Sequence, residues 1–357
     1  MNKTKILYTI PNFDTAGSGK VLYDLAKGLD TNRFEVHIAC HNDKGVFFKQ
    51  IKELKKPIHF LNITQPYRPY LTLIARLKLY RKLLKDHKID IVHSWHWSSD
   101  WTEALACRLS GVKYIYTKKA MTWGNKHWKI KSLLSHFIIT INDDMKAYFP
   151  WKRNQRLIPL GLDTNYYSTK SLDKINDNQR FTIVSVANLV PVKGIEVLIS
   201  SLMHLDHQNI QLIVVGDTRD AYADYLLNEV KKNDLIGIVN FTGKQPDIRP
   251  YLSIADLFVI SSKKEGMPMA LVEAMSMGIP VLGSDVSGIN YVLKEFKNLL
   301  FEAGNSIELS EKINEIIEMG KIERNTLGNN LRNYVTDNFS YNKFIKNHED
   351  LYISLIK

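Results

Sequence analysis

The sequence has little cysteine and no long hydrophobic run. Its 357 residues include two cysteines, Cys40 and Cys107. They are too few and too far apart to suggest a zinc site or a disulfide framework, which is typical of a reducing compartment. No stretch approaches the roughly 18 uninterrupted apolar residues of a membrane span, and the first residues lack the form of a signal peptide. We therefore expect a cytoplasmic protein.

The composition is that of a folded protein: 45% of the residues are hydrophobic and 24% are charged. These values exclude intrinsic disorder and allow one or two ordinary cores. The positive charge is concentrated in the first half, because residues 1–165 hold 28 Lys and Arg against 13 Asp and Glu, whereas residues 166–357 hold 20 against 24. All six tryptophans also lie in the first half. The asymmetry indicates an anionic partner for that half, such as lipid head groups or an acidic glycan.

Short apolar runs alternate with helical patterns along the whole chain, which predicts parallel α/β architecture. Strands are expected at residues 5–10, 34–39, 57–61, 89–94, 113–117, 137–141, 181–187, 210–216, 238–243, 256–261 and 280–284. Helices are expected near residues 18–29, 46–55, 70–87, 99–110, 193–205, 219–233, 269–277, 305–319 and 321–335.

The polar stretch 168–180 has little to bury and predicts a linker between two domains, residues 1–167 and 181–336. Residues 337–357 carry apolar side chains at spacings of three or four. They predict a C-terminal helix, which could pack back on the first domain.

The stretch SSKKEGMPMALVEAMSMGIPVLGSD, residues 261–285, is the most informative part of the chain. It follows an expected strand and enters a helix at about Pro268 or Met269, because proline suits the first helical turn. Gly266 allows a ligand to approach closely. The free amides of Met269, Ala270 and Leu271 would point toward a phosphate.

Two glutamates flank this turn, Glu265 before it and Glu273 eight residues later within the helix. One carboxylate can meet a ligand near its reacting end, and the other can accept hydrogen bonds from a diol such as ribose. Either residue alone could be a solvated glutamate or a helix cap. The combined glycine, proline and glutamate pattern favours a nucleotide site.

The stretch resembles the family 4 glycosyltransferases, retaining enzymes of the GT-B fold. Residues 265–288, EGMPMALVEAMSMGIPVLGSDVSG, follow the pattern of their C-terminal domains without a gap. Other pieces occur in the family's order: GSGKVLYDLAKGL, IPLGLDTNYY, VANLVPVKG and VVGD. The resemblance implies two Rossmann-like doubly wound domains facing a central cleft, the first binding the acceptor and the second a nucleotide sugar.

The resemblance also implies roles for single residues. Glu265 matches the first glutamate of the EX7E motif, which lies beside the donor sugar and is associated with catalysis, and Glu273 matches the second, which binds ribose. Lys193 matches the lysine that neutralises the donor diphosphate, and Gly17 matches a glycine of the first loop that lets the backbone approach the donor. The other donor-binding positions implied are Asn188, Gly266, Met267, Met269, Ala270 and Leu271.

The chain departs from the family's pattern at two positions. Asn188 stands where many relatives have an arginine beside the lysine, so the second positive charge is missing or comes from Lys263 or Lys264. Lys119 stands where many relatives have a histidine that helps to position the donor sugar.

His93 and His96 could replace that histidine, although a histidine at a strand end is more often a structural hydrogen-bonder. Trp95, which lies between them, and Trp97, Trp101 and Trp123 could stack on sugar faces or pack in the core. We assign His93, Trp95, His96 and Lys119 to the acceptor side of the site.

Other nucleotide and metal chemistries fit poorly. The GSGK string is not a P-loop, because Asp14 and Val21 stand where that motif needs a glycine and a Ser or Thr. The sequence has no dinucleotide fingerprint after a strand. Asp143 and Asp144 are better explained as helix capping residues. We expect no cofactor and no required metal.

The helix expected over residues 70–88 has one apolar face and several basic residues. The apolar residues are Leu73, Leu77, Tyr80 and Leu84, and the basic ones are Arg76, Arg81, Lys82 and Lys85. The helix could cover the sheet with its lysines in solvent. It could also rest on an anionic inner leaflet, where each nearby Lys or Arg contributes roughly 1 kcal/mol.

We therefore expect a metal-independent, retaining glycosyltransferase that moves a sugar from a nucleotide diphosphate, most simply UDP, to a glycan or lipid-linked acceptor in cell-surface polysaccharide or glycolipid synthesis. We expect no nucleic-acid partner and a cytoplasmic location, with peripheral contact at the inner face of the membrane. The alternatives are a GT-B nucleotide-sugar epimerase or hydrolase, and a non-catalytic GT-B scaffold that binds nucleotide or glycan.

Overall fold

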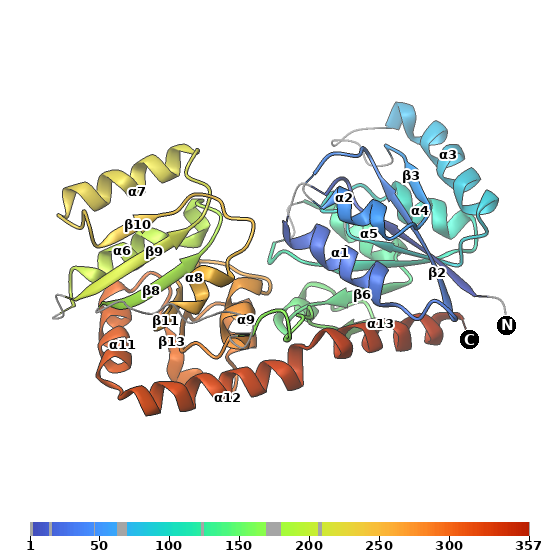
Figure 1. Ribbon diagram of the computed structural model, residues 1–357. Coiled ribbons are helices and arrows are strands. Elements are labelled where there is room, and N and C mark those ends of the chain that lie inside the picture. The colour runs from blue at the N-terminus through green and yellow to red at the C-terminus, as the bar shows by residue number, and fades with distance from the viewer. Residues whose placement is uncertain are drawn as a thin grey trace. The chain divides into compact units, whose positions relative to one another are not determined.

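The computed structural model describes residues 3–13, 16–45, 47–62, 70–122, 125–168, 180–205 and 209–356. The chain divides into two compact units, Met1–Gly161 together with Tyr341–Lys357, and Leu162–Ser340 (Figure 1). Of the linker expected at residues 168–180, the structure describes only Ser168 and Arg180. Trp123 also lies outside the described residues.

The first unit is built on a parallel sheet with the strand order β3-β2-β1-β4-β5-β6-β7. Its strands are Thr4–Thr9 (β1), Phe34–Cys40 (β2), Ile58–Phe60 (β3), Ile91–Ser94 (β4), Lys113–Lys118 (β5), Phe137–Thr140 (β6) and Gln155–Leu157 (β7). Its helices are Ala16–Gly28 (α1), Phe48–Glu53 (α2), Leu73–Asp86 (α3), Thr102–Leu109 (α4), His127–Leu134 (α5) and Tyr341–Ile356 (α13), with 3-10 turns at Tyr70–Thr72 (η1) and Asp144–Tyr148 (η2).

The second unit repeats this architecture with the parallel strand order β10-β9-β8-β11-β12-β13. Its strands are Phe181–Val186 (β8), Ile210–Val215 (β9), Val239–Phe241 (β10), Leu257–Ile260 (β11), Val281–Ser284 (β12) and Leu300–Phe301 (β13). Its helices are Ile195–Leu202 (α6), Ala221–Lys232 (α7), Arg249–Ser253 (α8), Met269–Ser276 (α9), Ser287–Val292 (α10), Ser306–Glu318 (α11) and Lys321–Phe339 (α12), with 3-10 turns at Pro191–Lys193 (η4) and Lys297–Leu299 (η5).

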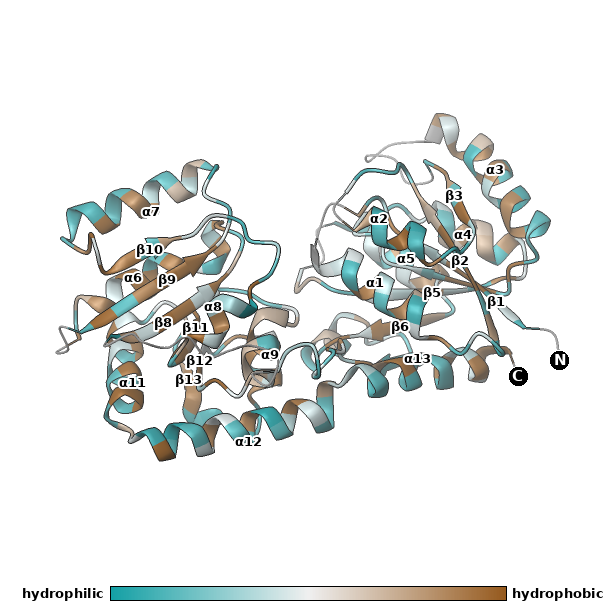
Figure 2. Ribbon diagram, in the orientation of Figure 1, coloured by the Kyte–Doolittle hydropathy of each residue, from teal (hydrophilic) through white to brown (hydrophobic). Residues whose placement is uncertain are grey.

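The strands are apolar because helices cover both faces of each sheet. Ile6, Leu7 and Tyr8 of β1 have no solvent exposure, and the same holds for Ile183 and Val184 of β8. Figure 2 shows hydrophobic residues running along the strands of the second unit, such as β8 and β9. Both sheets reverse their strand order beside the first strand, β1 or β8. In doubly wound sheets ligands bind outside the carboxyl ends of the strands at this reversal.

The C-terminal helix α13 belongs to the first unit. It buries the apolar face that the spacing predicted, including Phe344, Leu351 and Tyr352. The hydroxyl of Tyr341 donates to the backbone carbonyl of Asp24 over 3.0 Å. Figure 2 shows alternating hydrophilic and hydrophobic patches along α13.

The helix α3 confirms one part of its expected pattern and corrects another. Tyr80 and Leu84 are buried, as the apolar face predicted. Arg76, expected among the basic residues of the other faces, is only 7% exposed. Its Nη1 lies 2.7 Å from Oδ2 of Asp100, because a buried guanidinium needs a carboxylate partner.

Within the described part of the chain, none of the helices combines the length and the apolar character that crossing a bilayer requires.

Candidate active site

The reversal of strand order in the second unit brings Lys193 and Glu265 into contact. Lys193 ends the turn η4 that follows β8, and Glu265 lies in the loop that follows the neighbouring strand β11. Nζ of Lys193 lies 2.5 Å from Oε1 of Glu265. The hydroxyl of Ser262 donates to the same oxygen over 2.9 Å. The two residues implied for the donor diphosphate and the donor sugar thus form one hydrogen-bonded group.

The backbone beside Lys193 is fixed against the loop after β11. Gly194 has a φ of +62°, and a Cβ there would lie 2.2 Å from the carbonyl oxygen of Ser261. The Ser261 hydroxyl donates to the Gly194 carbonyl over 2.8 Å, and the Lys263 amide donates to the Val192 carbonyl over 2.8 Å. Only glycine fits at position 194, so the close approach of the two loops explains the Lys-Gly pair.

The loop that carries Glu265 also packs against α10. The amide of Gly288 donates to the carbonyl of Glu265 over 3.2 Å. A Cβ at position 288 would lie 2.5 Å from the carbonyl oxygen of Gly266 and 2.7 Å from that of Glu265. Gly288 therefore holds the backbone of Glu265, and the loop around Gly194 holds the preceding residues Ser261 and Lys263.

The helix α9 begins at Met269 after Pro268, close to the expected position. The amide of Leu271 donates to the carbonyl of Pro268 over 3.2 Å, so it is not among the free amides as the sequence suggested. The amides of Met269 and Ala270 stand in the first turn, where an α-helix offers no carbonyl partner. This end of the helix carries the positive end of its dipole.

Glu273 lies in α9 with a half-buried side chain. The hydroxyl of Tyr167 hydrogen-bonds to it, and burial together with the charge of Glu273 raises the pKa of Tyr167. The hydroxyl of Ser276, one turn later in α9, donates to the backbone carbonyl of Tyr167 over 2.9 Å. These contacts fix the position of the Glu273 carboxylate.

Asn188, which stands at the position of the missing arginine, and the two lysines considered in its place are all exposed. Asn188 is exposed, and its carbonyl accepts the amide of Val190 over 2.9 Å. Lys264 is also exposed. Nζ of Lys263 lies 2.6 Å from Oε1 of Glu196, so that cation is engaged at the start of α6.

The corresponding edge of the first unit places His93, Trp95 and His96 in the interior. His93 is fully buried, with Nδ1 2.7 Å from the hydroxyl of Tyr352 and Nε2 2.7 Å from the hydroxyl of Thr117. Burial lowers the pKa of both His93 and His96 well below the usual value. His93 therefore holds α13 to the sheet as a neutral structural residue, and none of the three side chains presents a surface to an acceptor.

Lys119 is half-buried at the same edge. Its Nζ donates to the hydroxyl of Ser18 over 3.0 Å and to the carbonyl of Trp95 over 2.5 Å. Burial and the positive charge of Lys131 lower the pKa of Lys119 to about 7.

Gly17 lies in the first turn of α1, and a Cβ there would meet no described atom within 4 Å. The protein's own packing therefore does not require a glycine at position 17.

Sequence reasoning missed several residues that shape these sites. Ser262 and Tyr167 hold the two glutamates of the EX7E motif. Their only signal was proximity to recognised motifs.

Glu103 is fully buried in the first unit, where it accepts hydrogen bonds from Ser94 over 2.8 Å and from the hydroxyl of Tyr114 over 3.1 Å. Burial raises its pKa.

Comparisons with known proteins agree with this architecture. The chain is 26% identical over 363 residues to the UDP-Gal:alpha-D-GlcNAc-diphosphoundecaprenol alpha-1,3-galactosyltransferase of Escherichia coli, covering 92% of this chain and 91% of that protein. It is 24% identical over 375 residues to an O-antigen biosynthesis glycosyltransferase of the same species, covering 99% of both chains. It superimposes on the crystal structure of Anabaena Alr3699/HepE in complex with UDP with a TM-score of 0.83 at 20% identity, covering 98% of this chain and 100% of that one.

The expected fold class, GT-B with two Rossmann-like doubly wound domains, is confirmed. Two family models match consecutive parts of the chain, "Glycosyltransferase Family 4" over residues 15–166 and "Glycosyl transferases group 1" over residues 169–334. Between them they take in every strand of the two sheets except β1, and the second covers the whole Lys193, Glu265 and Glu273 group. The chain therefore belongs to the family 4, or group 1, glycosyltransferases and is an enzyme of that class.

Proposed function

We propose that this glycosyltransferase moves a sugar from a UDP-sugar to a hydroxyl group of a glycan or lipid-linked acceptor with retention of the anomeric configuration. The observation that carries the proposal is the contact between Lys193 and Glu265 at the strand reversal of the second unit, with Glu273 eight residues further on in α9. The complex of the Anabaena neighbour with UDP supports the choice of nucleotide.

Lys193 and the first turn of α9 would hold the diphosphate. A lysine ammonium and helix amides stabilise negative charge that grows on a leaving phosphate, and they need no reorganisation at the moment of reaction. In this role Lys193 exchanges the Glu265 carboxylate for phosphate oxygens. We infer that this exchange couples donor binding to the release of Glu265.

Once released, Glu265 can face the donor sugar while Ser262 and Gly288 still hold it. A carboxylate there stabilises the positive charge that develops at the anomeric carbon. Glu273 would accept hydrogen bonds from the ribose diol, because Tyr167 fixes the carboxylate without neutralising it.

The transfer step replaces one bond at the anomeric carbon by another on the same face. The bond to the diphosphate oxygen breaks, and the electron pair leaves with the phosphate. The acceptor oxygen forms the new bond, and its proton passes to the departing phosphate oxygen. Positioning and fixed charges then supply the catalysis. In this scheme Lys193 and the α9 amides do the work of a cation, so we propose that the reaction needs no metal.

The first unit would receive the acceptor, and α3 would touch an anionic membrane surface. Ile74 is 69% exposed and Leu79 is 52% exposed, beside the exposed Arg81, Lys82 and Lys85. Apolar and basic side chains on one exposed helix suit a peripheral contact with acidic lipid. The name of the E. coli relative gives a lipid-linked diphosphate as its acceptor, which supports this choice.

The membrane proposal is tested by cosedimentation of the full chain with vesicles. We expect more binding to vesicles with anionic lipid than to neutral vesicles at low salt, and a loss of that difference in Lys82→Glu/Lys85→Glu. Equal binding of the wild type to both kinds of vesicle would contradict the proposed contact.

The transfer itself is tested by following UDP release from UDP-glucose and UDP-galactose, with and without acceptor extracts. We expect release that depends on acceptor and falls at least about 100-fold in Glu265→Gln. The matched control is Glu311→Gln, an exposed glutamate of α11. UDP release or a new sugar isomer without acceptor would indicate a hydrolase or epimerase, and nucleotide binding without turnover would indicate a scaffold.

A further inference from the structure

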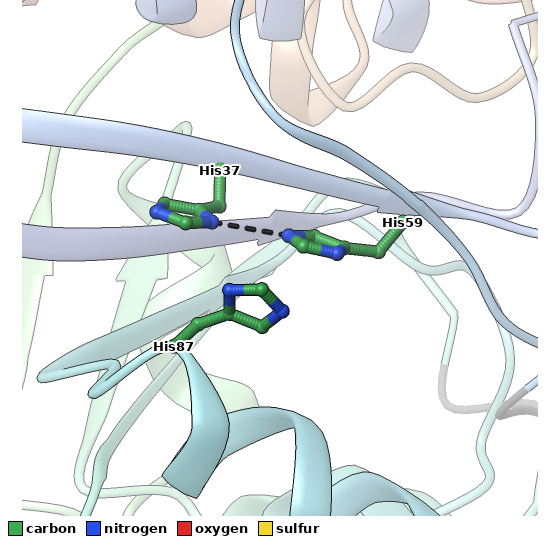
Figure 3. A group of neighbouring side chains, drawn as sticks. All are labelled: His37, His59 and His87. Carbon is green, nitrogen blue, oxygen red and sulfur yellow. Dashed lines mark hydrogen bonds between the residues drawn. The ribbon is translucent and has the colours of Figure 1, made fainter.

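Three histidines gather at one edge of the sheet of the first unit, from segments far apart in the sequence. His37 lies in β2, His59 in β3, and His87 directly follows α3. In the β2-β3 register His59 pairs with Ala39, two residues after His37. Side chains two residues apart in a strand share a face, so His37 and His59 project from the same face of the sheet. His87 meets them from the end of the helix (Figure 3).

The ring nitrogens lie at distances suited to a shared ion. Nδ1 of His37 is 3.0 Å from Nε2 of His59. One nitrogen from each of the three rings lies within 4.8 Å of the other two. Two imidazole nitrogens on a tetrahedral zinc ion are about 3.3 Å apart, since each zinc–nitrogen bond is about 2.0 to 2.1 Å. Small side-chain movements would bring all three nitrogens to such an ion.

A carboxylate orients one of the rings from behind. Nε2 of His37 lies 2.9 Å from Oε1 of Glu35, which leaves Nδ1 to face His59. Histidines that bind metals commonly donate their other ring N–H to a carboxylate, which fixes the ring and makes it a better ligand. Nζ of Lys5 lies 3.2 Å from the same oxygen of Glu35.

Each of the three rings offers one imidazole nitrogen as a ligand atom. Imidazole nitrogen suits zinc, copper and nickel, whereas calcium and magnesium prefer oxygen ligands. Among the residues that the structure describes, these histidines are the group of three or more His, Cys, Asp or Glu side chains placed to hold an ion.

We propose that His37, His59 and His87 bind one zinc-class divalent ion, with a water molecule in the fourth position. The ion tethers the edge strand β3 to β2 and to the end of α3. Since β3 is three residues long, such a tether adds stability where the sheet has little pairing. The ion would join three segments that lie far apart in the sequence, which is a structural role.

The test uses the full chain, freed of metal by a chelator and then dialysed against Zn²⁺. We expect one zinc per chain by elemental analysis, and the visible spectrum of tetrahedral cobalt when Co²⁺ replaces it. Zinc at 100 times its dissociation constant should raise the unfolding temperature of the metal-free protein by roughly 4 °C.

His59→Gln and His87→Gln should each lose the bound zinc and the thermal shift, whereas His204→Gln, an exposed histidine of the second unit, should keep both. Circular dichroism of the metal-free variants establishes that they fold, and His87→Gln changes a residue outside the sheet. Zinc that remains at one equivalent in both cluster variants, or no stoichiometric zinc in the wild type, would overturn the proposal.

Discussion

The contact between Gly288 and the Glu265 loop allows a sharp test of how precisely Glu265 must be placed. In Gly288→Ala the new Cβ would lie 2.5 Å from the carbonyl oxygen of Gly266, whereas ordinary van der Waals contact starts at 3.4 Å. The carbonyl must therefore move by about 0.9 Å, the difference between these distances. The same Cβ would lie 2.7 Å from the carbonyl oxygen of Glu265, so that backbone moves as well.

A displacement of about 1 Å in a positioning element can cost about 100-fold in rate. We therefore expect Gly288→Ala to lower kcat for UDP-sugar turnover by about 100-fold. The fold should survive, because Gly288 lies in the first turn of α10 and alanine favours a helix by roughly 0.5 to 1 kcal/mol over glycine. That gain offsets part of the strain in the displaced loop.

The assay compares initial rates of UDP release with thermal unfolding followed by circular dichroism. Gly320→Ala is the matched control, since a Cβ there would meet no described atom within 4 Å and the backbone φ is −62°. Wild-type turnover in Gly288→Ala would refute the reasoning, because Glu265 would then tolerate the displacement. A loss of the folded state in Gly288→Ala alone would equally contradict it.

Three further changes test the packing and the electrostatics. In Gly328→Ala a Cβ would lie 1.9 Å from the carbonyl oxygen of Gly278. We expect this overpacking to lower the free energy of unfolding, measured by urea titration, by about 1 to 3 kcal/mol. An unchanged urea midpoint would contradict this contact. Tyr167→Phe removes the hydroxyl that holds Glu273. Calorimetry should show UDP binding weakened about 2- to 10-fold in this variant. An affinity equal to that of the wild type would show that Tyr167 has no positioning role. Lys119→Met removes a lysine whose pKa is lowered to about 7, whereas the unfolded lysine stays protonated to about pH 10. The folded wild type therefore gains stability from this group as pH rises from 7 to 10. The rise in unfolding temperature from pH 7 to 9 should be smaller in Lys119→Met than in the wild type. An equal rise in the two proteins would argue against the lowered pKa.

The sequence predicted the long regular elements, because each carries its own periodic pattern. The strands expected at 5–10 and 181–187 appear as β1 and β8, and the helix expected at 321–335 appears as α12, four residues longer. The missed elements are the helices α5, α8 and α10 and the strands β7 and β13. Strand β7 is the triplet Gln155–Leu157, and β13 has two residues, so pairing with a neighbour and not local pattern makes them strands.

The proposed donor site could be predicted further than the side-chain contacts of the first unit. Glu265 and Glu273 lie eight residues apart in one segment, so the strand-to-helix pattern alone placed them together. By contrast, the buried Arg76 pairs with Asp100, a residue 24 positions later in the sequence. The cluster of His37, His59 and His87 likewise depends on strand register and on where α3 ends, which the sequence does not specify locally.

The central claim, that the second unit holds a nucleotide diphosphate through Lys193, is tested most directly by calorimetric titration of UDP into the full chain in EDTA. We expect one UDP per chain and an affinity about 10- to 100-fold lower in Lys193→Met, since a hydrogen bond to a charged group contributes about 1.5 to 3 kcal/mol. Lys321→Met, an exposed lysine at the start of α12, should bind as the wild type does. No binding of UDP by the wild type, or equal affinity in Lys193→Met, would contradict the account.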